Sequence, residues 1–286
     1  MSIVVTGATG QLGGLVVEDL LSRGVPADQI VAAGRNRERL TELGQLGVQT
    51  RVIDFDDPAS LHEAFAGADR VLLVSGNEVG DRVRLHTNAI EAAKAAGVGL
   101  VVYTSFPKAA ETSVVLAAEH AGTEEALVAS GLTYTILRNG IYMENYAGRA
   151  AEHAARGTIV GSAGSGRISS APRAELAEAA SVVLTTDGHA NKVYELGGDQ
   201  AFTMDELAAE IARHSGRPVE YQDLPVDEYV KVLVGAGLPE GFARILADSD
   251  RGASEGELQL DTGDLARLLG RPVKTMPEAV AEALEA

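Results

Sequence analysis

The chain has 286 residues, with 24 Lys and Arg against 41 Asp and Glu, which gives a formal net charge of −17. This acidic balance argues against nucleic acid and anionic membrane surfaces as partners, because their phosphates would be repelled. The chain holds no Cys, which excludes disulfides, thiolate metal sites and cysteine nucleophiles. We expect a cytoplasmic protein, since no segment reaches the roughly 20 apolar residues of a membrane span and no signal peptide is recognisable.

The first half of the chain alternates short Val- and Ile-rich runs with segments of helical periodicity. The runs are typical of parallel strands buried on both faces, and they cover residues 3–6, 30–33, 48–53, 71–75, 100–104 and 134–137. The predicted helices end within two residues of a glycine and cover residues 12–23, 37–45, 59–65, 83–96 and 115–130. Repeated strand and helix units of this kind predict an α/β fold, a doubly wound parallel sheet of the Rossmann type.

The pattern loosens after about residue 145. A helix at 173–186 and a strand at 193–196 extend the main sheet, and Thr203 with Glu206 forms the capping-box pattern of a helix that ends at residue 215. Further helices are predicted near residues 226–235, 239–248 and 261–269. We therefore assign residues 1–157 and 172–198 to the sheet domain, and residues 158–171 and 199–286 to a smaller mixed lobe.

A glycine-rich loop joins the first predicted strand to the first predicted helix. Gly7, Gly10 and Gly13 permit a sharp turn, close approach of a pyrophosphate, and close packing of the helix on the sheet, in that order. The helix then offers free N–H groups and its positive dipole end to phosphates. The loop therefore predicts a dinucleotide site in the sheet domain. The loop residues Thr9, Gln11 and Leu12 are also predicted to bind the cofactor.

The residues after the second predicted strand indicate which dinucleotide is bound. NAD sites commonly place a carboxylate there, but this chain has Gly34, Arg35, Asn36 and Arg37. Because Arg35 can pair with a 2′-phosphate, the sequence favours NADPH, with NADH as the less favoured cofactor. Asp54, at the end of the third predicted strand, is a candidate for the adenine amino group or a simple turn residue.

Three other patterns are assigned no function. The segment 252–256 matches the Gly-x-Ser-x-Gly pattern of hydrolases, but no His follows it as that motif requires, and we interpret it as a chance match in a loop. The six His show no His-x-x-x-His spacing, so we predict no metal site. Arg82 and Arg84 are interpreted as a small solvated basic patch.

The chain resembles the atypical short-chain dehydrogenases of the NmrA-like family, and among them the bacterial NAD(P)H:quinone oxidoreductases. The matching stretches are residues 6–13, 93–98, 103–105, 137–146 and 247–254. A sister group, the triphenylmethane-dye reductases, is similar over the same length. By position, the resemblance implies a cofactor path lined by Ser75 and Gly76, a nicotinamide near Thr104 and Ser105, and a wall for the ring and the substrate formed by Asn139, Gly140 and Tyr142.

Ordinary short-chain dehydrogenases use Tyr-x-x-x-Lys as acid-base machinery, and none of the seven Tyr here has Lys four residues later. Alcohol and ketone chemistry is therefore disfavoured, whereas an electron-poor quinone needs little more than positioning to accept a hydride. Tyr142 and Tyr146 are candidate proton donors, and no flavin is required. His120 shares a helical face with Glu124, so it is a candidate for an acid-base or positioning role, or one half of a surface pair.

The resemblance leaves two functions open. One is an NADPH-dependent oxidoreductase acting on a quinone or a similar conjugated acceptor, for which the smaller lobe is the substrate-binding lobe, with dye reduction as a close variant. The other is a redox sensor, which binds NADP(H) without turnover and acts through a protein partner. The stretch 138–142 resembles the enzymes and favours catalysis. The acidity neither requires nor forbids a dimer, so both a monomer and a homodimer stay open.

Overall fold

The computed structural model describes residues 1–285, and these divide into two compact units. Unit 1 comprises Met1–Phe106, Glu119–Asn139 and Arg173–Tyr194. Unit 2 comprises Pro107–Ala118, Gly140–Pro172 and the described residues from Glu195 onward.

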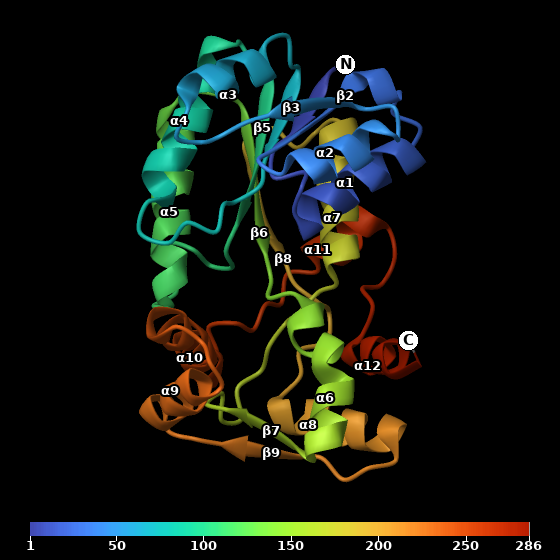
Figure 1. The fold of residues 1–286 in the computed structure, drawn as a ribbon, viewed down its shortest axis with the longest axis vertical. Coiled ribbons are helices and arrows are strands. Elements are labelled where there is room, and N and C mark those ends of the chain that lie inside the picture. Colours follow the sequence, from blue (N-terminus) through green and yellow to red (C-terminus); the bar gives the residue numbers. More distant parts are fainter. Residues whose placement is uncertain (286) are drawn as a thin grey trace. The chain divides into compact units, whose positions relative to one another are not determined.

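A seven-stranded sheet forms the centre of unit 1, in the order β3-β2-β1-β4-β5-β6-β8 (Figure 1). Its strands are β1 Ile3–Val5, β2 Ile30–Gly34, β3 Gln49–Val52, β4 Arg70–Leu73, β5 Leu100–Ser105, β6 Tyr134–Asn139 and β8 Lys192–Leu196. β1 to β6 pair in parallel. The strand order reverses between β1 and β4, which is where doubly wound sheets bind ligands at the carboxyl ends of their strands. The predicted Rossmann-like fold class is confirmed.

Helices cover both faces of this sheet. They are α1 Gln11–Ser22, α2 Arg37–Gly44, α3 Pro58–Phe65, α4 Arg82–Ala95, α5 Val115–Ala129 and α7 Arg173–Thr185, with a 3₁₀ turn at Ala27–Gln29. Figure 1 shows α1, α2 and α7 on one face and α3, α4 and α5 on the other. All six match the predicted helices to within one residue at each end. Buried side chains such as Val4, Phe65 and Tyr103 fill the core, and this fixes the strand ends that carry the site.

One predicted strand is less buried than expected. We predicted that the run at 48–53 is buried on both faces, but Gln49 and Val52 of β3 are exposed. The reason is its place in the sheet: β3 is the edge strand and pairs only with β2.

Unit 2 is built around a small parallel sheet of β7 Thr158–Gly161 and β9 Glu220–Asp223, two strands that the sequence analysis missed. Its helices are α6 Ala150–Arg156, α8 Met204–Ser215, α9 Val226–Gly235, α10 Glu240–Ser254, α11 Asp264–Leu269 and α12 Met276–Glu285, with 3₁₀ turns at Met143–Asn145 and Ala147–Arg149. The capping box of Thr203 and Glu206 at the start of α8 is confirmed. α10 runs six residues past the predicted end, and α6 and α12 were not predicted. No helix within residues 1–285 is long and apolar enough to cross a membrane.

Candidate cofactor site

The glycine loop has the geometry that its spacing predicts. Gly7 has a φ of +61°, which favours glycine. The turn that it begins is closed by a hydrogen bond, in which the Gly10 N–H donates to the Gly7 carbonyl at 2.9 Å. A β-carbon on Gly13 would lie 2.7 Å from the Gly7 carbonyl carbon, closer than any side chain tolerates. The helix α1 therefore packs directly on the loop. Gly10 is its N-cap and no side chain caps it, so Gln11 and Leu12 begin the helix at an end suited to phosphate.

The end of β2 lies against this loop. A β-carbon on Gly34 would lie 2.7 Å from Thr9 Oγ1, so the Thr9 side chain rests on the strand end. Arg35 follows, with its side chain 67% exposed, and its Nη1 lies 2.7 Å from Glu78 Oε1 on the segment after β4. Glu78 was not among the predicted site residues, although it is the one carboxylate between β4 and Asp81.

Threonine hydroxyls join the carboxyl ends of three neighbouring strands. Thr6 Oγ1, just after β1, donates to the Leu72 carbonyl and accepts from the Val74 N–H, both at 3.0 Å. Thr104 Oγ1 of β5 accepts from the Ser75 N–H at 2.9 Å. These bonds hold the predicted cofactor residues Ser75 and Thr104 together at the ends of β4 and β5.

Gly76 is held from behind by two buried side chains of α4. Its N–H donates to His86 Nε2 at 3.1 Å, and its carbonyl accepts from Arg82 Nε at 3.1 Å. Arg82 also pairs with Glu119 of α5 at 2.9 Å, so the interpretation of Arg82 as a solvated cation is wrong: it is buried because its partner lies on another helix. Burial, and then the Arg82 charge, lowers the pKa of His86 to about 3, so the ring is neutral.

His120 is buried rather than on the surface. Its Nδ1 lies 2.8 Å from the Tyr103 hydroxyl, and neither group is exposed. Burial, with Arg82 and His86 as smaller causes, lowers the pKa of His120 to about 3, and burial raises the pKa of Tyr103. Both groups are therefore neutral near pH 7. The role of His120 in acid-base work or positioning stays a prediction, but its hydrogen-bond partner is Tyr103 and not Glu124.

Glu124 instead binds Arg138 of β6 and Ser105 of β5. Arg138 donates from Nε and Nη2 to the two carboxylate oxygens at 2.9 and 2.7 Å, and Ser105 Oγ donates to Oε1 at 2.5 Å. The ion pair is 13% and 9% exposed on its two sides. A buried ion pair therefore fixes the hydroxyl of Ser105, a residue predicted to lie near the nicotinamide.

Asn139 ends β6, and its amide oxygen is buried without a hydrogen-bond partner in the part of the chain that the structure describes. Such an atom favours a ligand donor at this place, since buried polar groups are normally satisfied. In unit 2, a β-carbon on Gly140 would lie 2.7 Å from the Ser169 carbonyl, so glycine is required there by packing. Tyr142 forms an isolated parallel bridge with Ala171. The cofactor roles of Gly140 and Tyr142 stay predictions.

Tyr146 lies in a half-buried group of titratable side chains in unit 2, together with Tyr229 and Asp250. Its ring packs edge-on against Phe202 with centroids 5.5 Å apart. Burial, and then the nearby Asp250 and Tyr229, raises its pKa. Burial also raises the pKa of Asp250 to about 6, although that carboxylate accepts the Ser162 N–H at 2.8 Å. A proton can therefore reside on Asp250 below about pH 6, while the donor role of Tyr146 stays a prediction.

Asp54 lies beyond the end of β3 and is exposed. Its Oδ1 accepts the Asp56 N–H at 3.0 Å, which is the bond of a local turn. Its role toward adenine stays a prediction. The structure thus gathers the glycine loop, Arg35, Ser75, Gly76, Thr104 and Ser105 at the carboxyl ends of β1, β2, β4 and β5, with Asn139 at the end of β6.

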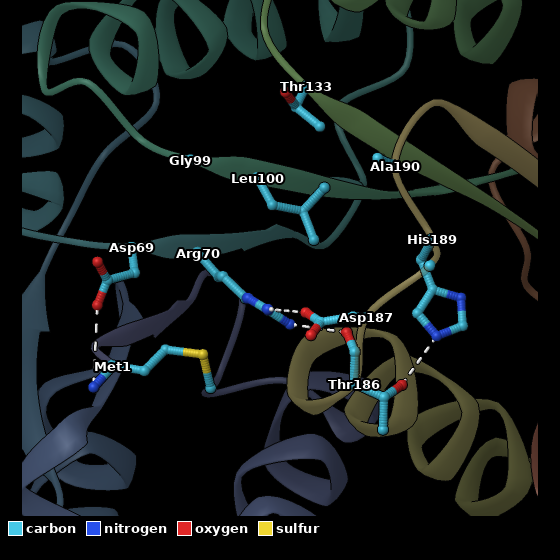
Figure 2. A pocket seen from close by; sticks show the side chains of 11 residues that line it. Met1, Asp69, Arg70, Gly99, Leu100, Thr133, Thr186, Asp187, His189 and Ala190 are labelled. Atoms are coloured by element: carbon cyan, nitrogen blue, oxygen red, sulfur yellow. Dashed lines mark hydrogen bonds and ion pairs between the residues drawn. The ribbon is translucent and has the colours of Figure 1, made fainter.

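A pocket of about 620 Å³ lies at the amino-terminal ends of the strands, where β4, β5 and β6 begin (Figure 2). Its polar groups pair with one another: Arg70 binds the carbonyls of Leu184 and Thr186 and the Asp187 carboxylate, and Thr186 binds His189. None of the predicted site residues lines it. We therefore assign the site to the carboxyl ends and not to this pocket.

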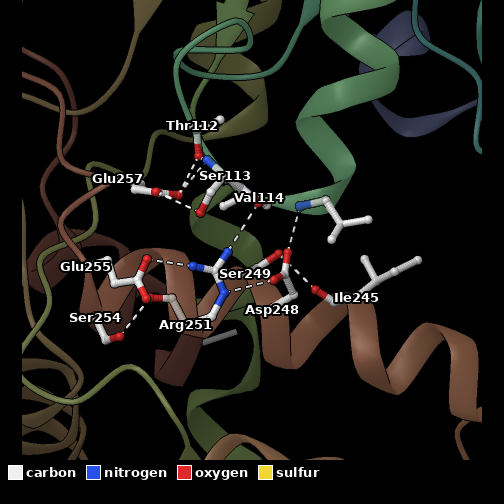
Figure 3. A network of polar contacts seen from close by, with 11 residues as sticks. Thr112, Ser113, Val114, Ile245, Asp248, Ser249, Arg251, Ser254, Glu255 and Glu257 are labelled. Atoms are coloured by element: carbon white, nitrogen blue, oxygen red, sulfur yellow. Dashed lines mark hydrogen bonds and ion pairs between the residues drawn. The ribbon is translucent and has the colours of Figure 1, made fainter.

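The first three residues of the segment 252–256 are helical and only the last two form a turn, which corrects our interpretation of the whole segment as a loop. Gly252 and Ser254 belong to the last turn of α10, and the Ser254 hydroxyl donates to the Arg251 carbonyl at 2.7 Å. Figure 3 shows Arg251 as the centre of a network with Asp248, Glu255 and the Ser113 carbonyl. The structure therefore supplies no strand-to-helix turn and no free nucleophile here. Within residues 1–285, no group of three or more His, Asp and Glu side chains is placed to hold a metal.

Comparisons with known proteins agree with this geometry. The model of the NmrA-like family matches residues 1–262. The chain is 47% identical over 279 residues to quinone oxidoreductase 2 of Escherichia coli K12, covering 98% of this chain and 97% of that protein. The solved structure of the E. coli NADPH-dependent quinone oxidoreductase with NADPH superposes with a TM-score of 0.96 at 46% identity, over 99% of both chains. The Citrobacter triphenylmethane reductase with NADP(H) gives 0.94 at 42% identity, over 99% of this chain and 100% of that one.

Proposed function

The chain belongs to the NmrA-like family, and from this premise we propose that it is an NADPH-dependent oxidoreductase that transfers a hydride to a quinone or a similar conjugated acceptor. The observation that carries the proposal is the similarity over nearly the full length to the E. coli quinone oxidoreductase, together with a cation and no acid at the end of β2. We assign the binding of the cofactor to the sheet domain and the binding of the acceptor to the smaller lobe.

The residues at the strand ends fit NADPH. The glycine loop and the uncapped start of α1 suit the pyrophosphate, Arg35 suits the 2′-phosphate, and the unpartnered Asn139 oxygen suits a donor of the cofactor. When bound, NADPH supplies a hydride from its nicotinamide ring. Ser105, fixed by Glu124, and Thr104, bonded to the Ser75 N–H, orient the site beside that ring.

The acceptor side needs little acid-base chemistry. A quinone that gains a hydride becomes a hydroquinone anion, which its ring stabilises. Positioning of the quinone against the nicotinamide therefore supplies most of the catalysis. His120 is neutral and hydrogen-bonded to Tyr103, which leaves the proton to solvent or to Tyr142 or Tyr146. As proposed, the reaction uses no Tyr-x-x-x-Lys pair, no flavin and no metal. The cytoplasmic location stays a prediction, and both a monomer and a homodimer stay open.

The first experiment follows the absorbance of NADPH, and separately of NADH, with benzoquinone, a naphthoquinone and a triphenylmethane dye. We expect loss of NADPH only when an acceptor is present. Arg35→Ala should weaken NADPH binding by roughly ten- to a hundredfold, because charged hydrogen bonds contribute about 1.5–3 kcal/mol, and should leave NADH use unchanged. Arg213→Ala is the matched control, since it removes another exposed arginine that pairs with a glutamate.

The result separates three readings of the site. Turnover of quinones identifies the reductase, and turnover of the dye instead identifies the variant that the similarity to the Citrobacter enzyme favours. Binding of NADPH with no turnover on any acceptor would refute catalysis and leave the redox sensor. If Arg35→Ala affects both cofactors equally, the preference for NADPH does not come from the 2′-phosphate.

A further inference from the structure

The ion pair between Arg35 and Glu78 spans the cofactor site. Arg35 follows β2 and Glu78 follows β4, and the strand order places β1 between them. Their contact at 2.7 Å therefore crosses the end of β1, where the glycine loop leaves the sheet. An anion and a cation thus already meet at the place where a 2′-phosphate is expected.

The segment that carries Glu78 is fixed at both ends and open in the middle. Gly76 is bonded to His86 and Arg82, and the Gly80 N–H donates to Glu119 Oε1 at 2.7 Å. Between these anchors Asn77 and Val79 are exposed, whereas Glu78 turns back and is only 32% exposed. Its other carboxylate oxygen, Oε2, lies against Gly76 in the space that a β-carbon would fill. Glu78 is therefore placed by Arg35 and by the missing side chain of Gly76, not by its neighbours in the segment.

We propose that Glu78 is an internal competitor for Arg35, which the 2′-phosphate of NADPH displaces on binding and which takes Arg35 back when the oxidised cofactor leaves. This inference rests on the proposed function, since it concerns the cofactor of that same site. A phosphate carries a charge of about −1.5 to −2 at pH 7 and three acceptor oxygens, so it outcompetes one carboxylate for a guanidinium. NADH carries a hydroxyl at that position and leaves the ion pair in place.

The competition has a consequence for the reaction cycle. Glu78 lowers the affinity for NADPH and for NADP⁺ by the same factor, because both carry the same 2′-phosphate. Release of product limits the rate of many enzymes, so a carboxylate that recaptures Arg35 shortens the time that NADP⁺ stays bound. Glu78 is thus a positioning residue for Arg35, and its effect is to speed the release of NADP⁺.

The test measures binding by titration calorimetry, with NADPH, NADP⁺ and NADH as ligands. Glu78→Gln keeps the shape and removes the charge, and should tighten NADPH and NADP⁺ about two- to fivefold, the range of an exposed ion pair, without changing NADH. The gain should shrink in 0.5 M salt, because exposed charges are screened. In the Arg35→Ala background, Glu78→Gln should have no effect. Glu42→Gln is the matched control, since it breaks the exposed pair with Arg39 of α2.

The titrations distinguish competition for Arg35 from the alternatives. Equal tightening of NADH would show that Glu78 obstructs the site instead of competing for Arg35, and an unchanged NADPH affinity would show that it does neither; both overturn the inference. Failure of the wild-type protein to bind NADPH would refute the cofactor of the proposed function. Binding of NADPH without quinone turnover would refute the reductase alone, and the same titrations would still decide whether Glu78 competes for Arg35.

Discussion

Two ion pairs in unit 1 use the same two kinds of side chain and differ in their surroundings. Arg35 and Glu78 are 67% and 32% exposed and share one contact, whereas Arg138 and Glu124 are 13% and 9% exposed and share two, with Ser105 as a third partner. The shortest distance in each pair is 2.7 Å. Contact distance therefore does not separate them. Burial does, because a water-facing pair can exchange partners with a ligand and a buried pair cannot without a large loss.

The largest effect is expected from breaking the buried pair. Glu124→Gln removes the carboxylate charge that Arg138 meets inside the protein, and breaking a buried pair costs about 3–5 kcal/mol. Urea unfolding should show this loss as a lower midpoint. Glu125→Gln is the control, because Glu125 is the exposed neighbour on the same helix. A loss below about 1 kcal/mol would place the Glu124 pair in the same class as exposed pairs and remove the distinction.

The buried region should also respond to acid. His86 and His120 have pKa values lowered to about 3, so each contributes stability that is present above the ordinary value of 6.5 and is lost as the pH falls toward 3. At pH 5 we expect a loss of about 2 kcal/mol for each histidine relative to pH 7. His86→Gln keeps a partner for Gly76 and cannot titrate, so its decline between pH 7 and 5 should be smaller. Parallel decline of both proteins in urea unfolding would contradict a neutral, buried His86.

A smaller effect is expected at the glycine loop, which lies beside the end of β2 that carries Arg35. Gly13→Ala would place a β-carbon 2.7 Å from the Gly7 carbonyl carbon, and the strain should cost about 1–3 kcal/mol and weaken NADPH binding. Gly14→Ala is the matched control one residue on, where the nearest atom would lie at 3.4 Å. Equal behaviour of the two variants in calorimetry and unfolding would show that the close approach of α1 is unimportant.

The glycine loop and Arg35 could be predicted from the sequence because their signals are local. The glycine spacing and Arg35 directly after a Val- and Ile-rich run lie within short windows, and the helices end at glycines. β3 was placed correctly but its burial was not, since nothing in the run at 48–53 says that it forms the edge. β7 and β9 were missed because each spans four residues and they pair across some sixty positions.

The buried polar contacts were not readable, for a physical reason. His120 and Glu124 stand four residues apart on one helix, and this local spacing indicated a pair, but Tyr103 and Arg138 on two strands bind them instead. Arg82 was interpreted as solvated because its partner, Glu119, lies 37 residues away. Tertiary partners override local spacing wherever burial makes an unpaired charge costly. Glu78 carries no signal at all until the strand order brings it opposite Arg35.

The smallest effect completes the comparison. Glu78→Gln breaks an arginine–glutamate pair just as Glu124→Gln does, yet its free energy of unfolding should change by less than about 1 kcal/mol, because water solvates Arg35 once its partner is gone. Urea unfolding of the two variants side by side measures the difference directly. A loss for Glu78→Gln as large as that for Glu124→Gln would mean that the pair across the glycine loop holds the fold together, and then no cofactor could displace it cheaply. A stability within error of the wild type, combined with tighter NADPH binding, would instead identify the Arg35 pair as one that a ligand can exchange.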